Sequence, residues 1–143
     1  MKACPFCDTD GGRLVYRGRK LRVVHASEDG FPAFYRVIWQ AHEREFTDLP
    51  RADRMLCMDA VAVVERAVRE HLQPDKMNLA ALGNRVPHLH WHVIGRFLWD
   101  THFPQPVWSK AERDDDDTRL QGLWAQLPLA EKDMAHALAE LAQ

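Results

Sequence analysis

Residues 87–94 read PHLHWHVI, a run in which histidine alternates with a large apolar residue. On a β-strand, successive side chains point to opposite faces, and neighbours on one face lie about 6.6 Å apart. The three histidines therefore line one face, while Leu89, Trp91 and Val93 line the other. Solvated strand faces usually carry Thr, Lys, Glu or Arg, so packing alone does not explain three imidazoles in a row. We interpret this face as a chemical site.

Two kinds of chemistry fit this pattern. Alternating histidines on a strand can bind a metal ion through their ring nitrogens, as in many zinc enzymes. Alternatively, one imidazole can attack phosphorus, because neutral histidine carries an unprotonated nitrogen near pH 7 without further activation. The histidine run by itself is compatible with both.

Along the sequence, strands are predicted both before and after one helix. Residues 76–82 and 88–97 read as two strands, separated by turn-forming residues at 83–87. Residues 21–25 and 34–39 are rich in β-branched and aromatic side chains and predict two more strands. This order favours an α+β sheet with its helices on one face over a repeating parallel fold.

A long helix is the strongest local signal. Apolar residues recur at helical spacing between residues 51 and 72, with Pro50 suited to the first turn and Pro74 ending the run. The members of this face are Leu56, Ala60, Val63, Val64, Ala67 and Val68. Residues 129–141 predict a shorter closing helix, and the acidic run 114–117 predicts a solvated loop.

Composition limits the classes of partner and compartment. The chain has 143 residues, 46% of them hydrophobic, which is enough for one modest core. A formal net charge of −2 gives no general attraction to nucleic acid or to an anionic membrane, so we expect neither as a partner. The sequence has three cysteines and no apparent signal segment, which predicts a cytoplasmic protein.

The histidine run and its two following apolar residues resemble the signature of the histidine triad (HIT) family. The other matching stretches are residues 36–42, 46–49, 83–87 and 100–108, together with Asn78. They resemble, in turn, a family strand that ends in a histidine, the helix entry, the phosphate-contacting loop, whose preceding strand carries Asn78, and the tail of a bacterial branch described as diadenosine tetraphosphate hydrolase-like. The resemblance covers roughly residues 4–108.

The resemblance implies a fold and a function. It implies an antiparallel sheet of about five strands, one long helix and a shorter C-terminal helix. Residues 1–110 would form the HIT domain, and residues 111–143 a C-terminal extension packed on or beside it. The implied activity is that of a nucleotide hydrolase or transferase acting on a nucleoside phosphoramidate or dinucleoside polyphosphate. A homodimer is also implied, and no cofactor is needed for the chemistry.

The resemblance also assigns roles to the catalytic histidines. His90 would attack the α-phosphorus and form a covalent nucleotidyl-histidine, while the backbone carbonyl of His88 holds its other ring nitrogen as a donor. His92 would donate to phosphate oxygens, and Asn78 and Asn84 would supply further neutral donors.

Three further residues complete the expected nucleotide site. Arg85 in the phosphate loop would add positive charge. At the place of the acidic residue that contacts the ribose hydroxyls in the family, one alignment puts Ala26, and another puts Glu28 or Asp29. Trp108 resembles an aromatic residue that helps to close the site of the neighbouring subunit in family dimers.

A second candidate site begins at the paired cysteines. Cys4 and Cys7 have the spacing that lets two thiolates bind one tetrahedral metal ion, although such a pair is weak evidence by itself. Several relatives complete such a site with an upstream histidine and the first triad histidine. In this chain these are His42 and His88, which gives a possible structural zinc site of Cys4, Cys7, His42 and His88. Cys57, within the predicted helix, is expected in the core.

Two other functions compete with the nucleophilic enzyme. One is a metal-dependent hydrolase in which all three histidines are ligands. The other is a nucleotide-binding protein with weak or no catalysis. It is motivated by Gly95, which stands in place of a common proline, and by the lack of an obvious acidic residue for the ribose hydroxyls. A second departure, Asn84 in place of a common glutamine, also affects the phosphate loop.

Overall fold

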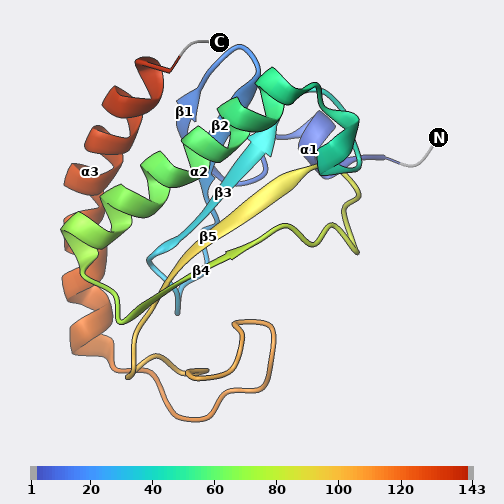
Figure 1. The fold of residues 1–143 in the computed structure, drawn as a ribbon. Coiled ribbons are helices and arrows are strands. Elements are labelled where there is room, and N and C mark those ends of the chain that lie inside the picture. Colours follow the sequence, from blue (N-terminus) through green and yellow to red (C-terminus); the bar gives the residue numbers. More distant parts are fainter. Residues whose placement is uncertain (1–2, 142–143) are drawn as a thin grey trace.

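The computed structural model describes residues 3–141, which form a five-stranded antiparallel sheet with helices packed against it (Figure 1). The strand order is β1-β2-β3-β5-β4, and every neighbouring pair is antiparallel. The strands are β1 (Arg13–Arg17), β2 (Leu21–His25), β3 (Phe34–Trp39), β4 (Lys76–Ala80) and β5 (His90–Arg96), and the helices are α1 (Pro5–Asp8), η1 (Phe46–Asp48), α2 (Arg51–Leu72) and α3 (Asp117–Ala139). This is the α+β architecture predicted from the sequence.

Three elements have the bounds that their sequence patterns predicted, namely β2, β3 and α2. The buried face of α2 contains the expected apolar residues, including Leu56, Ala60 and Val64. Pro50 occupies the N-cap, and Gln73 ends the helix in the left-handed region with a φ of 50°. The helix therefore begins and ends where backbone chemistry predicts.

The connection between β4 and β5 is longer than predicted, because β4 ends at Ala80 and β5 begins at His90. Gly83 has a left-handed φ of 71°. The N–H of His88 donates to the carbonyl of Val86 at 2.8 Å, which closes a turn instead of a sheet ladder. His88 therefore lies in the turn immediately before the strand.

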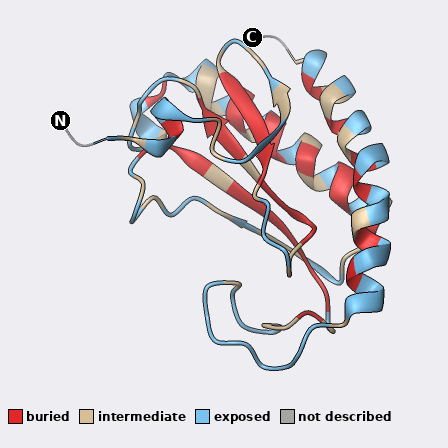
Figure 2. Cartoon of the chain, turned by 180° about the vertical axis from the view of Figure 1, so that it is seen from behind, coloured by how far each residue is buried: buried red, intermediate tan, exposed pale blue. Residues whose placement is uncertain are grey.

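The core lies between the sheet and the two long helices, which cover the same face of the sheet (Figures 1 and 2). Tyr35 and Val37 of β3 and Val93 of β5 are fully buried there against α2 and α3. On the opposite face, Phe6 of α1 packs against Val24 and Ile38. The long helices thus leave one face of β3 and β5 available for a site.

The C-terminal helix is longer than predicted and begins at Asp117 instead of Leu129. The side chain of Asp116 accepts a hydrogen bond from the backbone N–H of Arg119 and caps the helix, so the acidic run is partly a helix start. Pro128 lies inside the helix, where its missing N–H removes one backbone bond. Burial of Leu127 against the core holds the helix together at this point.

A long segment without regular structure, residues 97–116, joins β5 to α3 and forms the loop at the bottom of Figure 1. Within residues 3–141, no helix combines the length and apolar character needed to cross a membrane.

Candidate functional site

A cavity of about 460 Å³ opens at the histidine face of the sheet. His90 and His92 point to it from β5, while Trp91 between them packs with the core on the other face. The cavity is lined by Phe6, Arg36, Leu82, Gly83, Asn84, Arg85, Val86, His90, His92 and Trp108. The structure thus brings two of the three triad histidines together with most of the predicted phosphate loop.

The ring of His90 is held in one tautomer by the backbone. Its Nδ1 lies 2.7 Å from the carbonyl oxygen of His88, and a carbonyl can only accept, so Nδ1 carries the proton. The ring of Phe6 meets it edge-on at 4.7 Å between centroids. Burial lowers the pKa of His90, and the nearby charge of Arg36 lowers it further. His90 is therefore neutral at pH 7, with an unprotonated Nε2.

His92 lies beside the first ring, with 4.9 Å between ring centroids. Burial is the main cause that lowers the pKa of His92 to about 4, and the neighbouring His90 and Arg36 add to it. Its Nδ1 is buried and has no hydrogen-bond partner among residues 3–141. Because both imidazoles are uncharged at neutral pH, the positive charge of the cavity comes from arginine.

The predicted nucleotide-binding residues fall into two groups. Asn84, Arg85 and Trp108 line the cavity, and the ring of Trp108 lies 5.1 Å from that of His92 in the same chain. Asn78 instead lines a separate cavity of about 820 Å³, and its Oδ1 accepts a hydrogen bond from Arg96 at 3.0 Å. Glu28 is exposed in the loop between β2 and β3 and lies outside the cavity lining.

Three lining residues were not predicted as site residues from the sequence, Phe6, Arg36 and Leu82. Arg36 is the one charged residue in the strand β3. A single charge within an otherwise apolar strand is the sequence feature that could have marked it as a site residue. Burial lowers the pKa of Arg36, but a guanidinium stays protonated in proteins.

The first triad histidine belongs to a different cluster. The Nε2 of His88 donates to the carbonyl of Trp39 at 2.5 Å, so its Nδ1 is unprotonated in the neutral ring. This Nδ1 lies 3.4 Å from the Sγ of Cys4, 3.5 Å from the Sγ of Cys7 and 3.2 Å from the Nδ1 of His42. The four ligand-type atoms all lie within 4.8 Å of one another.

This donor set fits a tetrahedral zinc ion. Bond lengths of about 2.0 Å to nitrogen and about 2.3 Å to sulfur place ligand atoms about 3.3–3.8 Å apart in a tetrahedron. The closest separations in the cluster, 3.2–3.5 Å, agree with this geometry. The hydrogen bond from His88 to Trp39 is the kind of outer contact that orients a metal-binding histidine.

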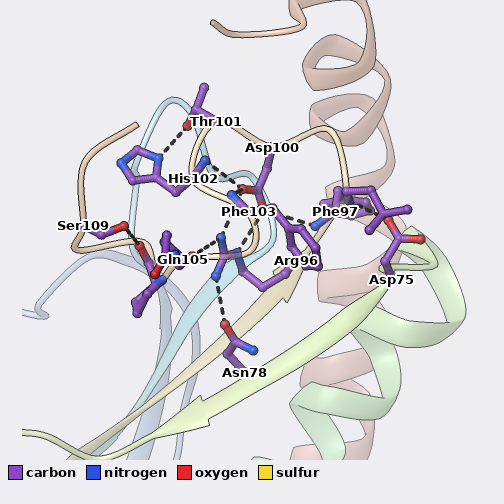
Figure 3. Close-up of polar contacts among 12 residues, drawn as sticks. Asp75, Asn78, Arg96, Phe97, Asp100, Thr101, His102, Phe103, Gln105 and Ser109 are labelled. Carbon is purple, nitrogen blue, oxygen red and sulfur yellow. Dashed lines mark hydrogen bonds and ion pairs between the residues drawn. The ribbon is translucent and has the colours of Figure 1, made fainter. Parts of the chain in front are cut away.

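A buried ion pair between Arg96 and Asp100 lies at the start of the long segment after β5 (Figure 3), the segment that also carries Trp108. The carboxylate of Asp100 accepts from Arg96 at 2.9 and 3.1 Å, and from the backbone N–H groups of residues 97, 102 and 103. Arg96 also donates to the carbonyl of Gln105 at 2.7 Å. Burial acts to raise the pKa of Asp100, but these hydrogen bonds outweigh it and the pKa is lowered.

Comparison with known proteins identifies relatives of the chain. Residues 11–98 match the family model described as the HIT domain. No curated protein matches the chain.

Several solved structures are similar to it. One is a histidine triad protein from Bradyrhizobium japonicum, with 27% identity and a TM-score of 0.69, covering 85% of this chain and 89% of that one. Another, from Marinobacter aquaeolei, has 26% identity and a TM-score of 0.69, and covers 90% of each chain. A zinc-bound histidine triad family protein from Mycobacterium smegmatis shares the fold, with 23% identity, a TM-score of 0.59, and coverage of 91% and 96%.

Proposed function

Because this chain belongs to the HIT domain family, we propose that it is a nucleotide hydrolase or transferase in which His90 attacks the α-phosphorus of its substrate. The observation that carries the proposal is the hydrogen bond from His90 Nδ1 to the carbonyl of His88, at 2.7 Å. It leaves Nε2 of a neutral, cavity-lining imidazole with a free lone pair.

The expected reaction has two steps. The lone pair of His90 Nε2 forms a bond to phosphorus while the bond to the leaving group breaks, and the leaving group departs with that electron pair. Water then attacks the same phosphorus, the P–Nε2 bond breaks, and a nucleoside monophosphate is released. Asn84 and His92 line the same cavity and are the neutral groups available to the phosphoryl oxygens.

The arrangement of the triad does not favour the metal-dependent alternative. Such an enzyme would need His88, His90 and His92 to converge on one ion. Among residues 3–141, the one cluster of metal-type ligands takes only His88 from the triad, together with Cys4, Cys7 and His42. We therefore propose a structural role for the cluster of Cys4, Cys7, His42 and His88, and a catalytic role for the cavity lined by His90 and His92.

Trapping the covalent intermediate tests the proposed function. Wild-type protein is mixed with adenosine and guanosine phosphoramidates and with dinucleoside polyphosphates, and the reaction is stopped with alkali. Intact-mass spectrometry should show the addition of one nucleoside monophosphate, and fragmentation should place it on His90. Turnover with the adduct on another residue would overturn the assignment. Nucleotide binding without any turnover would show a binding protein instead.

We propose a structural zinc ion at Cys4, Cys7, His42 and His88. When bound, zinc would link the N-terminal segment to the turn before β5 without leaving a coordination position open for water. The homodimer expected from the family resemblance remains a prediction.

Metal analysis tests the zinc proposal. Purified wild-type protein should contain about one zinc ion per chain, and the Cys4→Ser/Cys7→Ser variant close to none, because two thiolate ligands are lost. The matched control is Cys57→Ala, since Cys57 is buried within α2 and lies outside the cluster, so its zinc content should stay at the wild-type value. Equal zinc in the double variant and the wild type would refute the site.

A further inference from the structure

Arg36 and His92 form a cross-strand pair at the cavity. The register of β3 and β5 places Arg36 directly opposite His92, and Ile38 opposite His90. Among residues 3–141, three buried side-chain nitrogen atoms have no hydrogen-bond partner, and two of them are Arg36 Nε and His92 Nδ1. Two of these three unpartnered nitrogen atoms of residues 3–141 thus belong to one cross-strand pair at the cavity wall, and the third, Trp91 Nε1, belongs to a residue that packs against the core.

A purely structural role does not account for this arginine. Buried polar groups in folded proteins almost always have hydrogen-bond partners, so an unpaired buried N–H needs an explanation. Arg22 on the neighbouring strand β2 shows the usual case: it is buried and donates to Asp10, Gln40, Phe6 and Thr9, and it lies outside the cavity lining.

The contacts of Arg36 hold its guanidinium without using all of its donors. Nη1 donates to the carbonyl of Gly11 at 3.0 Å, and the guanidinium carbon lies 5.5 Å from the centre of the Phe34 ring. Glycine suits position 11, because its φ is 82° and a Cβ there would lie 2.7 Å from Phe6 and 2.9 Å from Ile38. The group is therefore oriented and charged, and its Nε has no partner, although the charge of Glu28 acts on it. An open guanidinium donor of this kind is available to a phosphate.

The position of Arg36 indicates which phosphate it serves. In an in-line displacement, the leaving group departs on the side of phosphorus opposite to the nucleophile. Arg36 lies directly across from His92 and diagonally from His90. The residue directly across from His90 is Ile38, so Arg36 is one same-face position farther along β3. We propose that Arg36 binds the anionic phosphate that leaves, so that the substrates are nucleotides with a phosphoanhydride bond. This inference rests on the proposed function and narrows its substrate class.

Kinetics with two kinds of leaving group test the inference. For a dinucleoside polyphosphate, Arg36→Gln should lower kcat/KM by roughly 10- to 100-fold. This is the change in rate that corresponds to losing one hydrogen bond to a charged group. For adenosine phosphoramidate, whose leaving group carries no phosphate, the change should stay below about threefold. Arg36→Lys keeps the charge but not the planar fork, and should restore part of the loss. Arg66→Gln removes one exposed charge from α2 and should match wild type on both substrates. Equal losses on both substrates, or no loss on either, would overturn the inference.

A binding experiment separates this inference from the proposed function. In a His90→Ala background, which removes the nucleophile, calorimetry compares the affinity for ADP with that for AMP. We expect ADP to bind roughly tenfold more tightly, and Arg36→Gln to abolish that preference while Arg66→Gln keeps it. A preference unchanged by Arg36→Gln would refute the role of Arg36. If wild-type protein turns over no substrate, the proposed function fails, and this experiment still decides the role of Arg36.

Discussion

His90→Ala should reduce turnover by about 10⁴-fold or more, because it removes the atom that forms the covalent bond to phosphorus. The remaining cavity would still bind nucleotide, since Arg36, Asn84 and Arg85 are unchanged. Single-turnover assays with a dinucleoside polyphosphate would measure the rate, and calorimetry would show that binding persists. The loss should therefore fall on kcat and not on substrate affinity.

His136→Ala is the matched control, because His136 is exposed on α3, far along the chain from the cavity residues. Its activity should stay within about twofold of wild type, in line with surface substitutions away from a site. Circular dichroism and zinc content should be the same for both variants and the wild type. A His90→Ala protein that keeps a tenth of the wild-type rate would eliminate His90 as the nucleophile.

Asp100→Ala should have the largest effect on stability, lowering the free energy of unfolding by about 3–5 kcal/mol. The substitution leaves the Arg96 guanidinium buried without its counter-charge, and it removes the acceptor for three backbone N–H groups. Urea denaturation followed by tryptophan fluorescence would measure the change. Asp114→Ala, an exposed acidic residue in the same segment, should change stability by less than about 0.5 kcal/mol.

The contribution of Asp100 has a defined pH dependence. Its folded-state pKa is lowered, so the stabilisation is fully present above the unfolded-state pKa of about 4 and is lost as the pH falls towards the folded-state value. The difference in stability between wild type and Asp100→Ala should therefore be constant near neutral pH and shrink in acid. A difference that grew on acidification would contradict the ion pair.

The sequence predicted best those elements whose pattern is local. In α2 the helical period, Pro50 and Gln73-Pro74 act together, and β2 and β3 have dense β-branched runs. β1 gave no such signal, because its five residues include two arginines and it lies at the edge of the sheet. Its conformation depends on pairing with the next strand, β2, and on contacts with α3, which is distant in sequence.

The start of α3 was missed for a different reason. Pro128 disfavours a helix interior, and the acidic run 114–117 was interpreted as a solvated loop although Asp116 is a good N-cap residue. Tertiary contacts reverse this preference. Leu120 and Leu123 are buried, and Glu131 farther along the helix accepts hydrogen bonds from Arg13 and Tyr35.

The candidate site was predicted in part from the family resemblance. The histidine cavity and the Cys/His cluster lie where that resemblance placed them, whereas Asn78 and Glu28 do not line the cavity. Arg36 could not be singled out, since an arginine in a strand is often paired within the protein, as Arg22 is. Gly95 has a packing reason, because a Cβ there would lie 3.0 Å from Ala33 and from Val68.

His88 participates in two structures through different atoms. Its imidazole lies next to the paired cysteines. Its main-chain oxygen accepts a hydrogen bond from Nδ1–H of His90. The two atoms belong to one residue, so the N-terminal cysteines contact the residue that precedes a strand more than eighty positions later. Thiol oxidation, or truncation before Phe6, would reach the reactive nitrogen through this single shared residue. The first residues of the chain and the proposed nucleophile thus share His88 as a neighbour.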